Sequence, residues 1–180
     1  MSELDLLRGL PQGKRNIKQR ETAKTQALID LSREYGADYF DGSRDVRYGG
    51  RWVPVARDII AHYGLMPGDR ILDVGCAKGF LVKDLLAEGI DAYGVDVSHY
   101  ALLNCEPEVV GRLHIGSAER LPFPDASFAV VLAINTLHNL KKPDLIAALH
   151  EMERLATRGK FLQVDSYRTE GRRKYSNPGF

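Results

Sequence analysis

Hydrophobic residues follow two different periods along this chain. Between Trp52 and Tyr63 they recur at helical spacing, and Gly64 ends that stripe. After residue 70, short apolar runs of strand length alternate with further helical stripes. Strands that alternate with helices indicate an α/β fold with a doubly wound, mostly parallel sheet. The pattern predicts helices at 19–35, 52–63, 78–88, shortly after 98 and 143–156, and strands at 70–74, 91–95, 111–115, 128–133 and 160–165.

The junction at residues 71–80 is the candidate ligand site. A buried apolar strand runs here into a turn that carries Gly75 and Gly79, and the turn runs into a helix. The two glycines relieve Cβ crowding where the backbone bends and approaches a ligand. Ligands of a doubly wound sheet bind outside the carboxyl ends of its strands. We therefore expect Asp73, near the end of the strand, to meet polar groups of the ligand.

The spacing of small residues at this turn argues against two common nucleotide motifs. The dinucleotide fingerprint G-x-G-x-x-G, counted from Gly75, places Ala77 at the second glycine and the bulky Phe80 at the third. The segment also has no G-x-x-x-x-G-K-[ST] pattern, so a phosphate-cradling loop is unsupported. What remains is a turn preceded by a carboxylate, with little provision for phosphate.

A second carboxylate follows the next predicted strand. The interval from Gly75 to Asp96 is close to the ~20 residues expected for a carboxylate that binds a ribose. Asp96 can accept hydrogen bonds from both ribose hydroxyls. The two strand ends together predict a site for a nucleoside-like ligand.

These segments resemble the motifs of the class I S-adenosylmethionine-dependent methyltransferases. Motif I of that family is an acidic residue followed by G-x-G-x-G, and residues 73–79 read DVGCAKG, with Ala77 in place of the middle glycine. Residues 116–128 read GSAERLPFPDASF and are similar to the family's D-A-E-x-L-P-F-x-D-x-S-F-D segment, with Ala129 in place of the final Asp. The resemblance implies a Rossmann-like fold and the cofactor S-adenosyl-L-methionine.

The resemblance also implies roles for individual residues. Ser117 takes the place of an Asp that accepts a hydrogen bond from the adenine amine. Val97, beside the ribose acid, is the apolar neighbour of the adenine. The loop at 134–140 is similar to the loop that closes over the methionine end of the cofactor. The implied cofactor-binding residues are Asp73, Gly75, Cys76, Ala77, Gly79, Asp96, Val97, Ser117, Ala118, Glu119 and Asn135.

Methyl transfer requires alignment and sometimes the removal of a proton from the acceptor. His138 is the best candidate for a catalytic base, because the unperturbed pKa of histidine lies near neutrality. The alternative for His138 is a structural role, in capping or packing that loop. No metal is mechanistically required, and the two cysteines make neither a metal nor a disulfide framework. Further candidates for the base are Tyr39, Tyr48, Asp165 and Tyr167.

The chain divides into three predicted parts. Residues 1–64 form an N-terminal helical cap and lid, 65–168 the cofactor-binding core, and 169–180 a basic tail. Within the first part, residues 34–52 are either a functional lid or an ordinary loop packed on the core. The family core ends in a strand hairpin, which the residues after the fifth predicted strand are too few to supply. Either the protein is truncated, or a homodimer mate or another partner is expected to cover the exposed sheet edge.

Composition narrows the class of protein. The length of 180 residues predicts one domain. The formal net charge of +1 predicts no global attraction to nucleic acid or membrane. No apolar run approaches the ~18 residues of a membrane span, and no signal-peptide pattern is present. A cytoplasmic protein with no membrane partner is therefore expected.

The sequence thus predicts a methyltransferase that modifies an O or N atom of a small-molecule acceptor. A non-catalytic or partner-dependent S-adenosylmethionine-binding subunit is the alternative, suggested by Ala77, Ser117 and the short C-terminus. A nucleic-acid methyltransferase is a further alternative, suggested by the basic stretch at 8–24. The sequence after the fourth strand, Asn-Thr-Leu-His at 135–138, lacks an Asn-Pro-Pro-Tyr-like motif, which argues against nucleic acid.

Overall fold

The computed structural model of the chain describes residues 36, 40 and 48–164. Several predictions concern segments outside these residues, and they stay predictions. They are the helix at 19–35, the candidate bases Tyr39, Asp165 and Tyr167, and the basic tail at 169–180.

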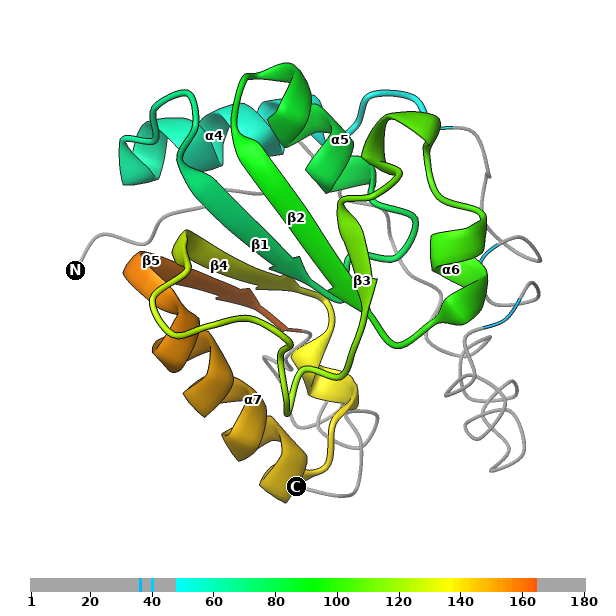
Figure 1. Cartoon of the computed structure of the whole chain (residues 1–180), viewed down its shortest axis with the longest axis vertical. Helices are drawn as coiled ribbons and strands as arrows, with labels where there is room; N and C mark the ends of the chain where they lie inside the picture. Colours follow the sequence, from blue (N-terminus) through cyan, green and yellow to red (C-terminus); the bar gives the residue numbers. More distant parts are fainter. Residues whose placement is uncertain (1–35, 37–39, 41–47, 165–180) are drawn as a thin grey trace, which may run out of the picture.

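A five-stranded sheet forms the centre of the described chain (Figure 1). The strand order is β3-β2-β1-β4-β5, and every pairing is parallel. The doubly wound parallel sheet predicted from the sequence is confirmed. Because the chain steps outward from β1 in both directions, a crevice is expected between the carboxyl ends of β1 and β4. The strands are β1 (Arg70–Val74), β2 (Asp91–Asp96), β3 (Leu113–Ile115), β4 (Phe128–Ile134) and β5 (Ala156–Gln163).

Helices cover both faces of this sheet. On one face, α4 and α5 pack against alternate strand residues such as Ile71 and Leu132. On the other face, α7 packs against the intervening residues, such as Leu72 and Val131 (Figure 1). The helical elements are α4 (Val53–Tyr63), α5 (Phe80–Ala87), α6 (His99–Leu103), η1 (Pro107–Val109), η2 (Leu137–Asn139) and α7 (Lys142–Leu155).

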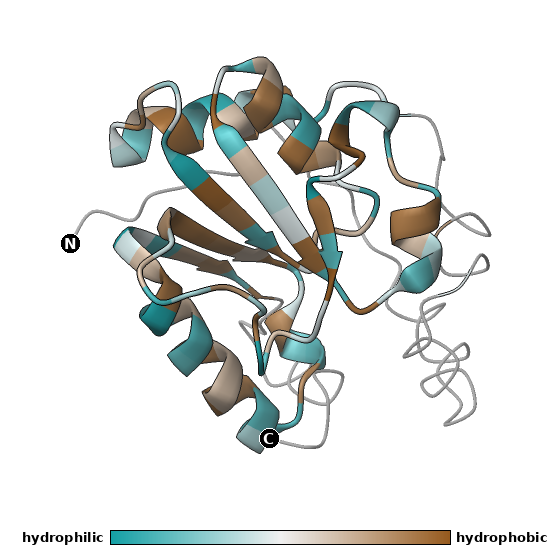
Figure 2. Cartoon of the chain, viewed as in Figure 1, coloured by the Kyte–Doolittle hydropathy of each residue, from teal (hydrophilic) through white to brown (hydrophobic). Residues whose placement is uncertain are grey.

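Burial on both faces explains the continuous apolar runs of the central strands. Figure 2 shows apolar residues concentrated in β1 and β4 and polar residues along the outer side of α7. Three α4 residues, Val55, Ala56 and Ile59, are fully buried in the same apolar cluster as the sheet. Helix α4 therefore packs on the core that contains the sheet, and the boundary at residue 64 stays a prediction.

Among the element boundaries that differ from the prediction, two have a clear physical reason. Helix α5 begins at Phe80, since Gly79 precedes it as N-cap in the left-handed region with φ of 80°. Strand β5 begins at Ala156, directly after α7, and not at residue 160. Among the described strands β5 pairs with β4 alone, so its partly exposed first half lacks the apolar alternation that marks a strand. Within the described part of the chain, no helix combines the length and apolar character needed to cross a membrane.

Candidate cofactor-binding site

A cavity of about 570 Å³ lies at the carboxyl ends of the central strands. This volume falls within the range of small-molecule sites. Its wall is built from the turn after β1, the end of β2, the loop after β3 and the residues that follow β4. The lining residues that the sequence predicted are Asp73, Gly75, Cys76, Ala77, Asp96, Val97, Ser117, Ala118, Glu119 and Asn135. Gly79 and His138 are not among the lining residues.

Gly75 allows the turn after β1 to approach the loop after β4. Its φ is 80°, in the region that favours glycine, and a Cβ built on it would lie 2.1 Å from Oγ1 of Thr136. The backbone amides of Gly75 and Cys76 both donate to the carbonyl of Val95, at 2.7 and 3.1 Å. The turn is thus fixed to β2 and closely packed on the residue that follows Asn135.

Ala77 and Asp96 are joined by a direct hydrogen bond. Ala77 has φ of 51°, a left-handed conformation that costs an alanine roughly 1–2 kcal/mol. Its amide donates to Oδ2 of Asp96 at 2.8 Å, which ties this conformation to the end of β2. The amide of Ser98 donates to Oδ1 at 2.9 Å. Both oxygens of Asp96 are therefore held by backbone amides, and the carboxylate keeps lone-pair capacity for a ligand hydroxyl.

Asp73 and Asp96 place two acids against the cavity. Asp73 is 5% exposed, and none of the described residues donates a hydrogen bond to its carboxylate. Burial, together with the nearby charge of Asp96, raises the pKa of Asp73 to about 7. Burial also raises the pKa of Asp96, although the amide hydrogen bonds from Ser98 and Ala77 oppose that shift. Such a pair suits a ligand that brings hydroxyl donors or a positive charge.

The loop after β3 is held in place by α7. Arg154 donates to the carbonyls of Leu121 and Phe123, at 3.1 and 2.8 Å, and to Asp125 at 2.8 Å. Glu151 binds the guanidinium of Arg154 and accepts from the amide of Leu121 at 2.7 Å. These bonds anchor the loop just beyond Ser117, Ala118 and Glu119. Sequence reasoning missed this anchor because its partners are about thirty residues apart and match no motif.

Gly79 and Cys76 have packing roles at this turn. A Cβ on Gly79 would lie 2.8 Å from Val109 and 3.0 Å from Leu113, so glycine permits α5 to start close to β3. The Sγ of Cys76 would lie 2.5 Å from a Cβ built on Gly94, which explains why β2 has a glycine at this position. Burial raises the pKa of the Cys76 thiol well above its usual value, so this group stays protonated.

Two of the candidate bases, His138 and Tyr48, belong to the described residues, and neither lines the cavity. His138 is in η2, where the neighbouring Asn139 lines the cavity and His138 does not. Tyr48 does not line it either, and its hydroxyl donates to Asp84 on α5. A catalytic role for either residue stays a prediction, without support from the lining.

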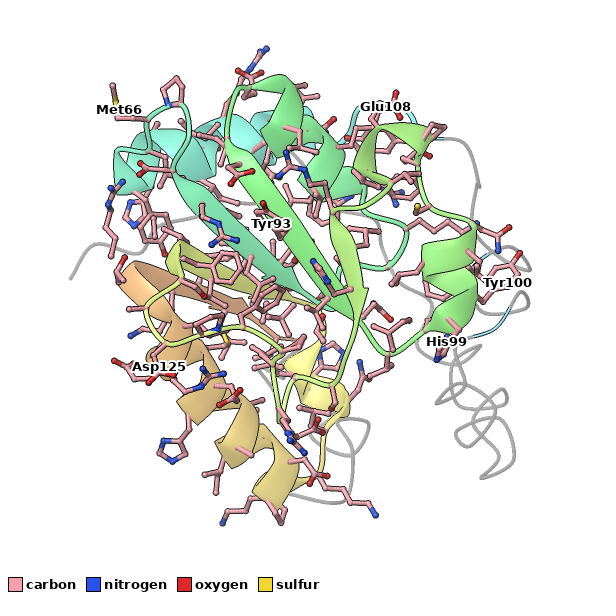
Figure 3. The ribbon with its side chains drawn as sticks, viewed as in Figure 1. Met66, Tyr93, His99, Tyr100, Glu108 and Asp125 are labelled. Atoms are coloured by element: carbon pink, nitrogen blue, oxygen red, sulfur yellow. The ribbon has the colours of Figure 1, made fainter. Side chains whose placement is uncertain are left out.

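Several lining residues were missed by the sequence reasoning. Lys78, 8% exposed, lies within the motif I segment itself, and its Nζ is 5.6 Å from the ring centre of Tyr100. Tyr100 extends from α6 (Figure 3). Other lining residues belong to segments that the sequence analysis singled out without assigning the individual residues. Among them are Phe40, Arg51 and Trp52 of the candidate lid at 34–52, and Thr136 and Asn139 of the loop at 134–140. Lys141 and Asp144, at the start of α7, come from a segment without a motif.

Comparison with known sequences covers the same part of the chain. Residues 72–163 match the family described as Methyltransferase domain. The demethylmenaquinone methyltransferase of Mycobacterium sp. (strain KMS) is 32% identical over 120 residues, which cover 67% of this chain and 51% of that protein. The ubiquinone biosynthesis O-methyltransferase of Alkalilimnicola ehrlichii is 29% identical over 154 residues, covering 81% and 58%. The chain thus spans about half the length of the curated relatives it matches.

Comparison with solved structures gives the same fold. CalS10, an amino pentose methyltransferase of Micromonospora echinaspora solved with S-adenosylmethionine bound, superposes with a TM-score of 0.56. The match covers 81% of this chain and 58% of CalS10 at 20% identity, so the likeness concerns the fold alone. The matched family spans β1 to β5, including both strand ends that carry Asp73 and Asp96. This chain therefore belongs to the methyltransferase-domain family of class I S-adenosylmethionine-dependent methyltransferases.

Proposed function

We propose that this chain binds S-adenosylmethionine in the cavity and transfers its methyl group to an O or N atom of a small-molecule acceptor. The observation that carries the proposal is Asp96, whose two oxygens are oriented by the amides of Ala77 and Ser98. Family membership supplies the class of reaction. The names of the two relatives, which refer to demethylmenaquinone and to ubiquinone biosynthesis, support an acceptor of small-molecule size.

The cofactor's nucleoside would occupy the β2 and β3 side of the cavity. Asp96 would accept hydrogen bonds from the ribose hydroxyls. Val97 is 47% exposed although it is apolar, and it lines the cavity. An adenine ring packed on Val97 would remove this apolar surface from water. Ser117 and Ala118 line the adjoining wall, where they could meet the polar edge of the base.

The cofactor's amino acid moiety would occupy the side near Asp73 and Asn135. An ammonium group there would supply the charge partner that the Asp73 carboxylate lacks among the described residues. Asn135 has φ of 55°, a left-handed conformation that asparagine tolerates, and it lines the cavity where β4 ends. Both residues would help to fix the methionine end.

When bound, the cofactor would supply an electrophilic methyl group on a sulfonium. The chain's own contribution to catalysis is then alignment of the acceptor and exclusion of water. The lining is polar at Arg51, Asn139, Lys141 and Asp144, and we propose that the acceptor binds near these residues. His138 stays our prediction for the base that removes the acceptor's proton.

The outer edge of β5 is the proposed contact for a homodimer mate or another partner. Leu162 and Val164 at this edge are 41% and 39% exposed. Covering them would remove apolar surface from water, and a partner could also pair with the edge of β5 that no described strand occupies.

Calorimetric titration with S-adenosylhomocysteine tests the proposal. Asp96→Ala should abolish binding, because it removes the acceptors for the ribose hydroxyls. Asp91→Ala is the matched control, since Asp91 lies at the opposite end of β2 and pairs with Arg112. A folded wild-type chain that does not bind would overturn the proposal. Binding without methyl transfer to any acceptor in a panel would support the alternative, a non-catalytic S-adenosylmethionine-binding subunit.

A further inference from the structure

The residues just before α4 form one wall of the cavity. We call residues 48–52 the wall segment. Arg51 and Trp52 within it line the cavity, whereas Tyr48 turns to α5. Phe80, the first residue of α5, also lines the cavity. The cavity wall on this side is therefore shared between the wall segment and α5.

The hydroxyl of Tyr48 joins these two parts of the wall. It donates a hydrogen bond to Oδ2 of Asp84 on α5, across 36 residues of sequence. It also accepts a hydrogen bond from the backbone amide of Trp52, at 3.2 Å. Trp52 is the N-cap of α4, and its own side chain makes no capping hydrogen bond. The Tyr48 hydroxyl thus bridges the start of α4 to the middle of α5.

The ring of Tyr48 supports the same wall. It stacks on the ring of Phe80 with centroids 4.7 Å apart and planes 9° from parallel. The Nζ of Lys83 lies 5.7 Å from the centre of the Tyr48 ring. Lys83 is in turn held by Glu106 and Glu108, at 2.8 and 3.1 Å. The ring therefore lies between a residue that lines the cavity and a set of charges fixed on α5 and η1.

Asp84 needs the donor that Tyr48 provides. Asp84 is only 5% exposed, although aspartate is usually found at the surface. Burial, with the nearby charges of Glu88 and Glu106, raises the pKa of Asp84 to about 6. A buried carboxyl that loses a hydrogen-bond donor is costly, so the contact resists separation of the wall segment from α5.

We propose that Tyr48 is a positioning residue, which fixes Trp52 and Arg51 in the cavity wall by bonding their segment to Asp84 and by supporting Phe80. The proposal assigns Tyr48 no contact with the reacting atoms. It deepens the proposed function, on which its effect on the cofactor rests. The position of the wall itself can be measured without any ligand.

Trp52 provides the measurement, because it is the only tryptophan of the 180 residues. Acrylamide quenching of its fluorescence in the ligand-free chain reports how exposed this part of the wall is. Tyr48→Phe keeps the stacking ring and removes only the hydroxyl. We expect its quenching constant to rise by about twofold, as in a locally opened segment. Its dissociation constant for S-adenosylhomocysteine should rise by about threefold to tenfold, the effect of one net hydrogen bond.

Tyr63→Phe is the matched control. The Tyr63 hydroxyl donates to the carbonyl of Lys160 at 2.8 Å, and Tyr63 does not line the cavity. This variant also loses one tyrosine hydrogen bond at an end of α4, so it shows the effect of a general loss of stability. We expect its quenching constant and its dissociation constant to match those of the wild type.

Two changes at Asp84 complete the test. Asp84→Asn keeps an acceptor oxygen for the Tyr48 hydroxyl and should quench like the wild type. Asp84→Leu has none and should quench like Tyr48→Phe. Quenching of Tyr48→Phe that equals the wild type would overturn the proposal, and so would equal quenching of the two Asp84 variants. A wild type that fails to bind S-adenosylhomocysteine would contradict the proposed function but leave the quenching comparison decisive for Tyr48.

Discussion

Gly75→Ala is expected to destabilise the fold, because the new Cβ makes the backbone conformation unfavourable and also overlaps with Thr136. The φ of 80° is unfavourable for any residue with a Cβ, by roughly 1–2 kcal/mol. The new Cβ would lie 2.1 Å from Oγ1 and 2.4 Å from Cγ2 of Thr136. Overpacking of this kind costs roughly 1–3 kcal/mol. The lower entropy of the unfolded alanine chain offsets roughly 0.4–1 kcal/mol of these costs, which leaves a net loss of about 1–4.6 kcal/mol.

Urea unfolding followed by far-ultraviolet circular dichroism measures this loss. A second variant separates the two costs, because Thr136→Gly removes all three atoms nearest to the new Cβ. In the double variant Gly75→Ala/Thr136→Gly, the part of the stability loss that comes from overpacking, roughly 1–3 kcal/mol, should disappear. The part that comes from the unfavourable φ should remain. A Gly75→Ala chain within about 0.5 kcal/mol of the wild type would refute the reasoning. So would strictly additive effects in the double variant, since they would mean that the two residues do not touch.

Further predictions concern the acids and the loop anchor. Because the folded pKa of Asp73 is raised to about 7, its contribution to stability is complete below the ordinary carboxyl pKa and declines as the pH rises through about 7. Between about pH 5.5 and 7 the decline is ~2 kcal/mol, and urea titrations of Asp73→Asn should lack it. The ammonium group of S-adenosylhomocysteine should favour the ionised form of Asp73, so binding below about pH 7 should release a proton. Calorimetric titrations in two buffers should detect this release. An affinity that does not change with pH would contradict the prediction. Arg154→Met should lower the free energy of unfolding by about 1.5–3 kcal/mol and weaken S-adenosylhomocysteine binding, whereas unchanged binding would mean that the loop keeps its place without the anchor.

The elements that sequence could predict are those with a strong apolar pattern. The continuous run at 128–134 and the stripe at 52–63 have one stable placement each, inside the core. The start of β5 could not be found in this way, because Thr157 and Arg158 lie on the last described strand and face solvent. Local pattern indicates a strand only where burial constrains the side chains.

The candidate site divides in a similar way. Asp73 and Asp96 were predicted because strand ends meet at one edge of a parallel sheet, and both line the cavity. Gly79 was predicted at the ligand, yet its missing Cβ leaves room for Val109 and Leu113. Both roles require the same glycine, so the sequence cannot distinguish them. Arg154 depends on contacts between distant segments, which no short motif records.

The central claim is that the cavity at the ends of β1, β2 and β4 holds the cofactor. Two-dimensional amide NMR of the uniformly labelled chain, titrated with S-adenosylhomocysteine, tests that claim residue by residue. If the cofactor binds there, the largest shift changes should occur at Gly75, Ala77, Val97 and Ala118, with little change along α7. Saturable changes confined to other surfaces, or a folded chain whose spectrum does not respond to excess ligand, would contradict the claim.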